Sequence, residues 1–167
     1  MNNKGFTLVE VLAVVVIIGI IGGIAIPAVL TTMNNGKQAS YEIMVKDILI
    51  ASETLYQEVE YSGNLKDKDN KNIQITGNEI QTDLATLISN GFLNGSYMEE
   101  ENADSEKKII NPKSKEDISE CKIKINKSIN SNSGAVNYTV ISVDNTIPSC
   151  PTTADYEKEE NNDKINK

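Results

Sequence analysis

The stretch that decides the fold is Lys4–Leu30, which reads KGFTLVEVLAVVVIIGIIGGIAIPAVL. From Phe6 to Leu30 it holds 19 apolar residues out of 25, and Glu10 is its only charged residue. The 20 residues that follow Glu10 are uncharged. As an α-helix they cover roughly 30 Å, which is the thickness of the hydrocarbon core of a bilayer. The sequence therefore predicts a helix that spans a membrane.

Two other interpretations of this stretch fit less well. A buried core helix of a soluble protein is normally interrupted by polar positions. A cleavable secretory signal has an apolar region of about 7–15 residues that ends in an Ala-x-Ala-like site. The nearest match, Ala25-Ile26-Pro27-Ala28, has the wrong spacing. A retained anchor is favoured, and Lys4 before the span predicts a cytoplasmic N-terminus with the larger part of the chain outside.

Glu10 is costly in such a helix. A carboxylate at the centre of a membrane helix costs about 2.5–3.5 kcal/mol, and less near an end. The 16 Leu, Ile, Val and Phe residues of the span contribute on the order of 5–10 kcal/mol, so insertion is still favourable. No basic residue within the span can pair with Glu10. Its partner is either a positive charge from elsewhere, such as another subunit or a newly formed α-amine, or headgroup water.

The segment Lys4–Glu10, with the apolar run after it, closely resembles the class III signal of type IV prepilins. The resemblance implies that a membrane peptidase removes the leader, residues 1–5, by cutting between Gly5 and Phe6. It also implies that the new amine of Phe6 is methylated, and that Glu10 pairs with the Phe6 amine of a neighbouring subunit during assembly. Gly5 suits the cut because a residue without a side chain lets the backbone approach a protease closely.

The span, residues 6–30, contains weak helical positions. Pro27 has no N–H for the carbonyl of Gly23, and each glycine costs roughly 1 kcal/mol relative to alanine. We expect a helix kink at Gly22, Gly23 and Pro27, and we hypothesise that this stretch extends when subunits pack. Gly19 and Gly23 form a small-xxx-small pattern that permits close helix packing, although such glycines also occur in helices without any assembly role.

A second helical segment is expected at residues 31–61, an amphipathic stalk. Its apolar positions recur at steps of three and four, as on one helix face, and they are Tyr41, Val45, Ile48, Ser52, Leu55 and Val59. The sequence Ser62-Gly63-Asn64 indicates the end of the helix. Asn34-Asn35-Gly36 is a candidate break.

Residues 62–154 are expected to form an extracellular globular head. Ile73–Ile75 suggests a short strand followed by a turn at 76–78, and Asp83 precedes a short helix that runs to Ser89. Residues 94–117 suggest a surface loop. Alternating apolar positions predict two antiparallel strands, at 121–127 and 136–140, with a turn at 130–134. The tail, residues 155–167, is so rich in charge and Asn that we expect disorder.

The predicted fold class is α+β and pilin-like, with a long N-terminal helix whose apolar half protrudes and whose other half packs on a small antiparallel sheet. Cys121 and Cys150 bracket the predicted hairpin. Outside the cell a disulfide between them could persist, and it would stabilise the head by roughly 3–4 kcal/mol. Many pilins carry a bridge near the C-terminus, so the resemblance implies this pairing. Two free buried thiols are the alternative.

Composition excludes several functions. The chain has no His, no Trp and no Arg, and its net charge is −8. Without imidazole, Ser-His-Asp or Cys-His nucleophiles and His-ligated zinc sites cannot form. An acidic chain does not suit nucleic acid, because phosphate binding needs a basic face. We expect no catalysis, no cofactor and no metal site.

The sequence therefore predicts a structural subunit of a type IV pilus, anchored in the cytoplasmic membrane before assembly and extracellular afterwards. Its expected partners are copies of itself, the prepilin peptidase, the pilus assembly machinery and, before assembly, membrane lipid. Adhesion, aggregation and twitching motility are what the resemblance implies for the filament. The alternatives are a pseudopilin of a secretion or DNA-uptake machine and a single-pass anchored binding domain that never polymerises.

Overall fold

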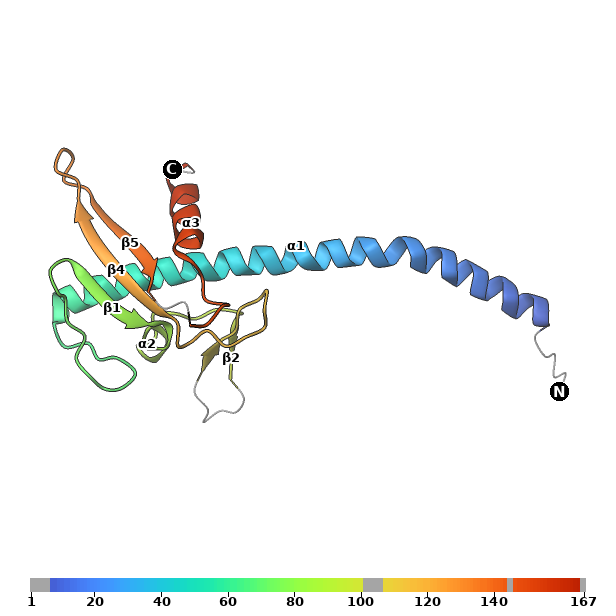
Figure 1. Ribbon diagram of the computed structural model, residues 1–167, viewed down its shortest axis with the longest axis horizontal. Coiled ribbons are helices and arrows are strands. Elements are labelled where there is room, and N and C mark those ends of the chain that lie inside the picture. The colour runs from blue at the N-terminus through green and yellow to red at the C-terminus, as the bar shows by residue number, and fades with distance from the viewer. Residues whose placement is uncertain (1–6, 101–106, 144–145, 166–167) are drawn as a thin grey trace. The chain divides into compact units, whose positions relative to one another are not determined.

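The structure is a computed structural model of the 167-residue chain and describes residues 7–100, 107–143 and 146–165, with only the backbone described at 162–165. It divides into two compact units, residues 1–38 and 39–167, and the first helix contributes to both. The elements (Figure 1) are α1 Leu8–Ser62, β1 Glu79–Asp83, α2 Leu84–Ser89, β2 Met98–Glu99, β3 Lys108–Ile109, β4 Lys122–Ile129, β5 Val136–Ser142 and α3 Thr153–Ile165.

The first unit consists of the N-terminal part of α1, whose apolar surface has no protein cover. Each large apolar side chain from Leu8 to Met33 is at least 52% exposed. Of the described residues, α1 alone is long and apolar enough to cross a membrane. The helix passes through Pro27 without a break, and the Thr31 hydroxyl donates to the Pro27 carbonyl at 3.1 Å. The candidate break at 34–36 is helical as well. The kink stays a prediction.

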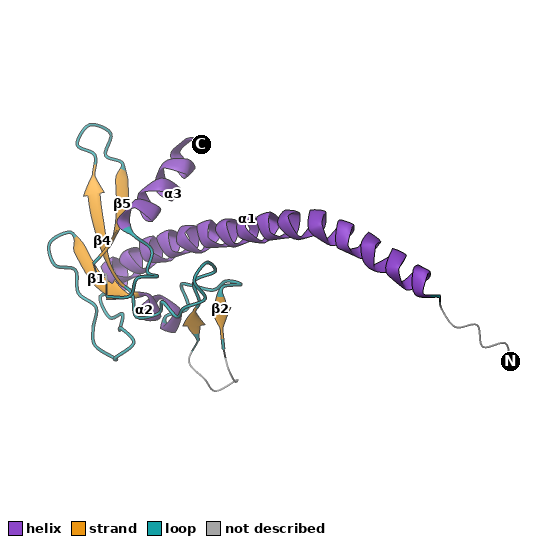
Figure 2. Cartoon of the chain, turned by 45° about the vertical axis from the view of Figure 1, so that its right-hand side comes forward, coloured by secondary structure: helices purple, strands orange, loops and turns teal. Residues whose placement is uncertain are grey.

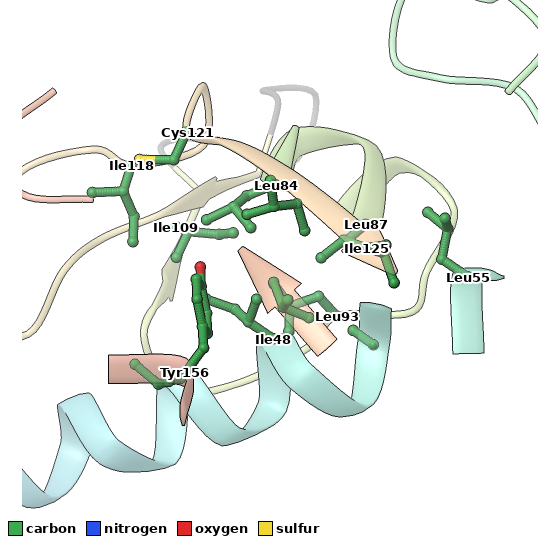
Figure 3. Packing of buried hydrophobic residues seen from close by; sticks show 14 of the residues in the cluster. Ile48, Leu55, Leu84, Leu87, Leu93, Ile109, Ile118, Cys121, Ile125 and Tyr156 are labelled. Atoms are coloured by element: carbon green, nitrogen blue, oxygen red, sulfur yellow. The ribbon is translucent and has the colours of Figure 1, made fainter. Parts of the chain in front are cut away.

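The second unit is built on the C-terminal part of α1. The predicted stripe is confirmed, because all six of its side chains are buried. They face a three-stranded antiparallel sheet in the order β1-β4-β5, shown in Figure 2 beside the helix. The core between them, part of which Figure 3 shows, consists mostly of aliphatic side chains together with buried tyrosines, Tyr156 among them. This arrangement confirms the predicted fold class of a long helix packed on a small antiparallel sheet.

The predicted hairpin is confirmed as β4 and β5. Ile125 pairs with Val140, and both are buried. The hairpin closes where the Gly134 amide donates to the Asn130 carbonyl at 2.8 Å, and Gly134 has a φ of 69°. Such a left-handed conformation suits glycine, which has no Cβ to clash with the backbone. Helix α2 also follows the prediction, because Asp83 caps it by accepting from the Thr86 amide.

Two expectations for the head were wrong. The strand expected at Ile73–Ile75 does not form; the strand that pairs with β4 is β1, which follows the turn at 76–78. The expected loop at 94–117 contains the short pair β2–β3, and Ile109 within it is fully buried. In both cases one inward-facing isoleucine among polar neighbours is enough for a strand, because the sheet buries only alternate side chains.

The expectation of a disordered tail was also wrong for the described residues, because they form α3. Tyr156 is its buried anchor, with 1% of its surface exposed. Asp155 closes the first turn, since its carboxylate accepts from the Thr152 amide at 2.8 Å and the Thr152 hydroxyl at 2.7 Å. Lys158 pairs with Glu42 of α1 at 3.1 Å. One well-buried aromatic and a capped first turn outweigh a composition that suggests disorder.

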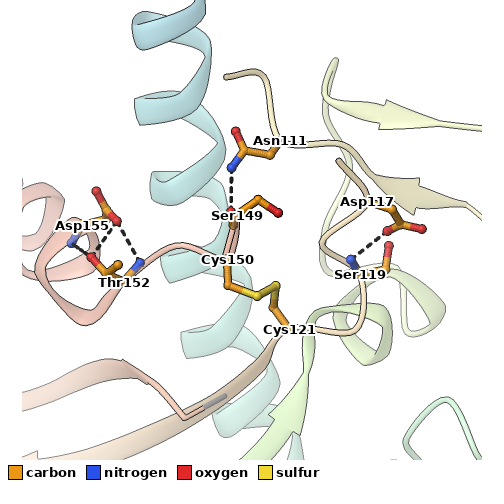
Figure 4. Close-up of a disulfide and its surroundings, with 8 residues drawn as sticks. All are labelled: Asn111, Asp117, Ser119, Cys121, Ser149, Cys150, Thr152 and Asp155. Atoms are coloured by element: carbon orange, nitrogen blue, oxygen red, sulfur yellow. Dashed lines mark hydrogen bonds between the residues drawn. A yellow bond between two sulfur atoms is a disulfide. The ribbon is translucent and has the colours of Figure 1, made fainter. Parts of the chain in front are cut away.

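A disulfide joins Cys121 to Cys150, with 5.8 Å between their Cα atoms (Figure 4). The same segment is held by the Asn111 side-chain amide, which donates to the Ser149 carbonyl at 2.6 Å. Both cysteines are buried. The bridge therefore ties the start of β4 to the residues that lead directly into α3.

Tyr156→Ala should destabilise the head by about 3–5 kcal/mol, because it removes a fully buried aromatic side chain. The measurement is urea unfolding of the detergent-solubilised full chain, followed by circular dichroism. Glu157→Ala, which changes the exposed neighbour on the same helix, is the control and should unfold like the wild type. Equal midpoints for the two variants would show that α3 is not docked through Tyr156.

Docking of α3 should also depend on pH through Asp155. Burial raises the pKa of this carboxyl, but hydrogen bonds from Thr152 and Tyr41 and the charge of Lys113 outweigh it, so the pKa lies below its ordinary value. The stabilisation is therefore complete above the ordinary aspartate pKa of about 3.9 and is lost as the pH falls through the lower, folded-state value. Amide exchange of α3, corrected for the intrinsic rate, should rise on acidification. Asp155→Asn should remove part of that dependence, and an unchanged profile would contradict the assignment.

Candidate assembly site at the start of α1

Glu10 lies in the first turn of α1 and is bound by the residue that precedes the helix. Its Oε2 accepts from the Thr7 amide and from the Thr7 hydroxyl, both at 2.8 Å. In return the Glu10 amide donates to the Thr7 hydroxyl at 3.3 Å. This reciprocal arrangement is a capping box, which satisfies backbone amides that have no partner within the helix.

The capping box was not anticipated, although the sequence contains its signal. The spacing of Thr7 and Glu10 fits the Ser/Thr-x-x-Glu pattern that marks helix starts. In the subunit, Glu10 is thus a polar group with local partners rather than a bare charge beside apolar neighbours. Both Thr7 bonds end on Oε2, and the second carboxylate oxygen takes part in neither.

The other predicted site residues are distributed along the chain. Gly5 and Phe6, the residues of the expected cut and methylation, lie outside the described residues. Gly22, Gly23 and Pro27 follow Glu10 by three turns or more of the same helix, so the structure does not gather them around it. Cys121 and Cys150 serve the head.

Gly19, Gly22 and Gly23 are not required by close packing within the single subunit. A Cβ added at Gly19, Gly22 or Gly23 would meet nothing within 4 Å. Each glycine nevertheless costs the helix about 1 kcal/mol relative to alanine. Glycines on a membrane helix let a second backbone approach closely, so these positions suit contact with other helices.

The described titratable residues of the head are not grouped as a metal centre would require. Within the parts of the chain that the structure describes, no three His, Cys, Asp or Glu side chains are grouped so that they could hold a metal ion. The carboxylates with clear partners serve packing or capping instead: Asp83 and Asp155 cap helices, and Glu42 and Glu60 pair with lysines.

A long N-terminal helix with an apolar first half, joined to a small α+β head, is a pilin-like architecture. Residues 1–26 match the family model described as the prokaryotic N-terminal methylation motif. The chain thus carries the class III signal that type IV pilins and pseudopilins share, which points to a structural rather than an enzymatic protein. No curated protein and no solved structure matches the chain.

Thr7→Ala should destabilise the first turn of α1, because it removes the hydroxyl of the capping box. Losing such a cap costs about 1 kcal/mol, so exchange of the first-turn amides should become roughly fivefold faster. The measurement is amide exchange of the full chain in detergent micelles. Thr7→Ser keeps a hydroxyl and should restore the wild-type rate; if it exchanges like the alanine variant, the hydroxyl is not the stabilising group.

Proposed function

We propose that this protein is a type IV pilin, a structural subunit that is processed between Gly5 and Phe6 and polymerised through α1. The observation that carries the proposal is the methylation motif at residues 1–26, which coincides with a helix whose apolar surface is uncovered in the subunit. A helix of this kind can reside in lipid or among copies of itself, and a filament core offers the second environment.

Processing removes the leader and creates a new positive charge. Hydrolysis of the Gly5–Phe6 peptide bond leaves an α-amine on Phe6, and methylation keeps it basic. Before the cut, Lys4 holds the leader on the cytoplasmic side of the membrane. After the cut, the first residue of the subunit is apolar, and the amine and Glu10 are the charged groups at the start of the helix.

Assembly then pairs Glu10 with the Phe6 amine of a neighbouring subunit. Inside an apolar filament core an unpaired charge costs several kcal/mol, and an opposite charge at hydrogen-bond distance offsets this. Only one axial register between two helices brings the groups together, so the pair also sets the stagger of subunits. Glu10 is positioned for this role by Thr7, which fixes its rotamer in the first turn.

The head remains in water outside the cell, with the disulfide and α3 holding it together. Adhesion, aggregation and surface motility are the roles we assign to the filament. A pseudopilin of a secretion or DNA-uptake machine is the second candidate, because the methylation motif is common to both groups.

Glu10→Ala tests the assembly mechanism in cells that carry the pilus machinery. The variant should insert into the membrane at the wild-type level, while surface filaments fall by at least about tenfold, since one unpaired charge costs more than 1.4 kcal/mol. Glu53→Ala is the matched control, because Glu53 is an exposed carboxylate on the same helix whose partner is its neighbour Gln57.

Wild-type filament levels in Glu10→Ala would contradict the role of Glu10. If the wild-type protein itself forms no filament in these cells, the protein is a single-pass anchored binding domain instead. Filaments that stay within the cell envelope and appear only with an active secretion or DNA-uptake machine would identify a pseudopilin.

A further inference from the structure

Strand β5 is an edge strand whose outer side is only partly covered. The sheet order β1-β4-β5 leaves one side of β5 without a strand. Helix α3 packs against β5, and at the end of the strand the Ser142 amide donates to the Thr153 hydroxyl at 3.2 Å. Figures 1 and 2 show α3 beside the Ser142 end of β5, while the other end runs on toward the hairpin turn.

The hydrogen-bond pattern identifies which backbone groups face this open side. The Val143 amide donates to Lys122, and the Asn130 amide donates to Ala135. Because backbone groups alternate along an antiparallel strand, odd-numbered residues of β5 face β4 and even-numbered ones face outward. The Ser142 bond to α3 agrees with this. Within the described residues, the outward amides and carbonyls of Val136, Tyr138 and Val140 have no hydrogen-bond partner on that side.

Beyond the part that α3 covers, this edge lacks the usual protection against strand pairing. Natural edge strands are blunted by lysine, proline, a bulge or a covering helix. Strand β5 reads VNYTVIS and contains neither proline nor charge. The whole segment from Ser128 to Val143 is uncharged, although the chain carries a net charge of −8. Two like copies repel through their charged surfaces, α3 among them, but the β5 segment itself adds no charge to that repulsion.

We propose that β5 is a homotypic docking edge, where the Val136–Val140 segment of one head pairs antiparallel with the same segment of a second copy. Antiparallel pairing of two identical edges is two-fold symmetric and closes on itself. Each partner supplies valine and tyrosine side chains, which favour strand pairing and cross-strand contact.

Combined with the proposed function, on which this part rests, the contact joins separate filaments. Subunits of one filament repeat head-to-tail, whereas a two-fold contact is isologous. A single short strand pair is weak, but a filament presents many edges at once, and linked contacts raise the overall affinity by about 10²–10⁴-fold. The β5 edge thus provides a route to lateral bundling of filaments.

The test uses the unprocessed full chain in phosphatidylcholine vesicles, so it requires neither the peptidase nor filament assembly. Val136→Lys places a charge on the edge, at a side chain that is 45% exposed. Ile129→Lys is the matched control, because Ile129 lies directly opposite Val136 on the central strand and is 63% exposed. Both variants add the same charge to the same end of the hairpin.

Light scattering should show that vesicles with the wild-type chain cluster, and amide exchange at Val136–Val140 should slow. Vesicles with Ile129→Lys should behave like the wild type. Val136→Lys should reduce clustering at least about tenfold, since the cost of placing an unpaired charge in each strand pair is multiplied over many contacts. Three results would overturn the proposal: wild-type vesicles that stay dispersed, equal effects of the two lysine variants, or no added protection of the β5 amides. Dispersed wild-type vesicles would indicate that the edge binds a foreign peptide instead of a second copy. A failure of filament assembly in cells would affect only the proposed function.

Discussion

The apolar surface of α1 from Leu8 to Met33 must be withdrawn from water, and the rest of the molecule is arranged around that requirement. Side chains that are more than half exposed along a helix of this length cannot remain so in an aqueous environment. In the proposed function, lipid satisfies the requirement before assembly, and neighbouring copies of α1 satisfy it afterwards. Glu10 is the one charge on this stretch of α1 that both environments must accommodate. Its hydrogen bonds from Thr7 lie at the start of the same helix, so they do not depend on which environment surrounds it.

The same helix then becomes the spine of the head. Between Tyr41 and Val59 the apolar side chains on one face of α1 are buried, because the sheet and α3 cover that face. Much of the core comes from the helix, so the head depends on α1 for its stability as well as for its attachment. The disulfide holds the segment before α3 on the head, and Tyr156 of α3 is buried in the same core as the stripe of α1.

The sequence was most informative where a physical period or an unbroken run governs structure. The apolar run of the span and the stripe at steps of three and four predicted α1 and its buried face, and the alternation in β4 and β5 predicted the hairpin. It was least informative where a single residue decides: Ile80 makes β1 a strand, Ile109 makes β3 one, and Tyr156 orders a tail whose composition suggests disorder. At the site, the spacing of Thr7 and Glu10 contains the capping-box signal, whereas the membrane cost of Glu10 indicates only that the carboxylate needs a partner. The stagger of Glu10 against Phe6 is a property of the proposed filament, and one chain alone does not contain it.

The most direct test of the account is intact-mass and N-terminal peptide mass spectrometry of the protein recovered from the surface of cells that carry a prepilin peptidase. The account predicts a chain that begins at Phe6, has lost residues 1–5, and carries one added methyl group on the Phe6 amine. A surface protein that still begins at Met1 would contradict processing, and with it the assembly mechanism built on the Phe6 amine and Glu10.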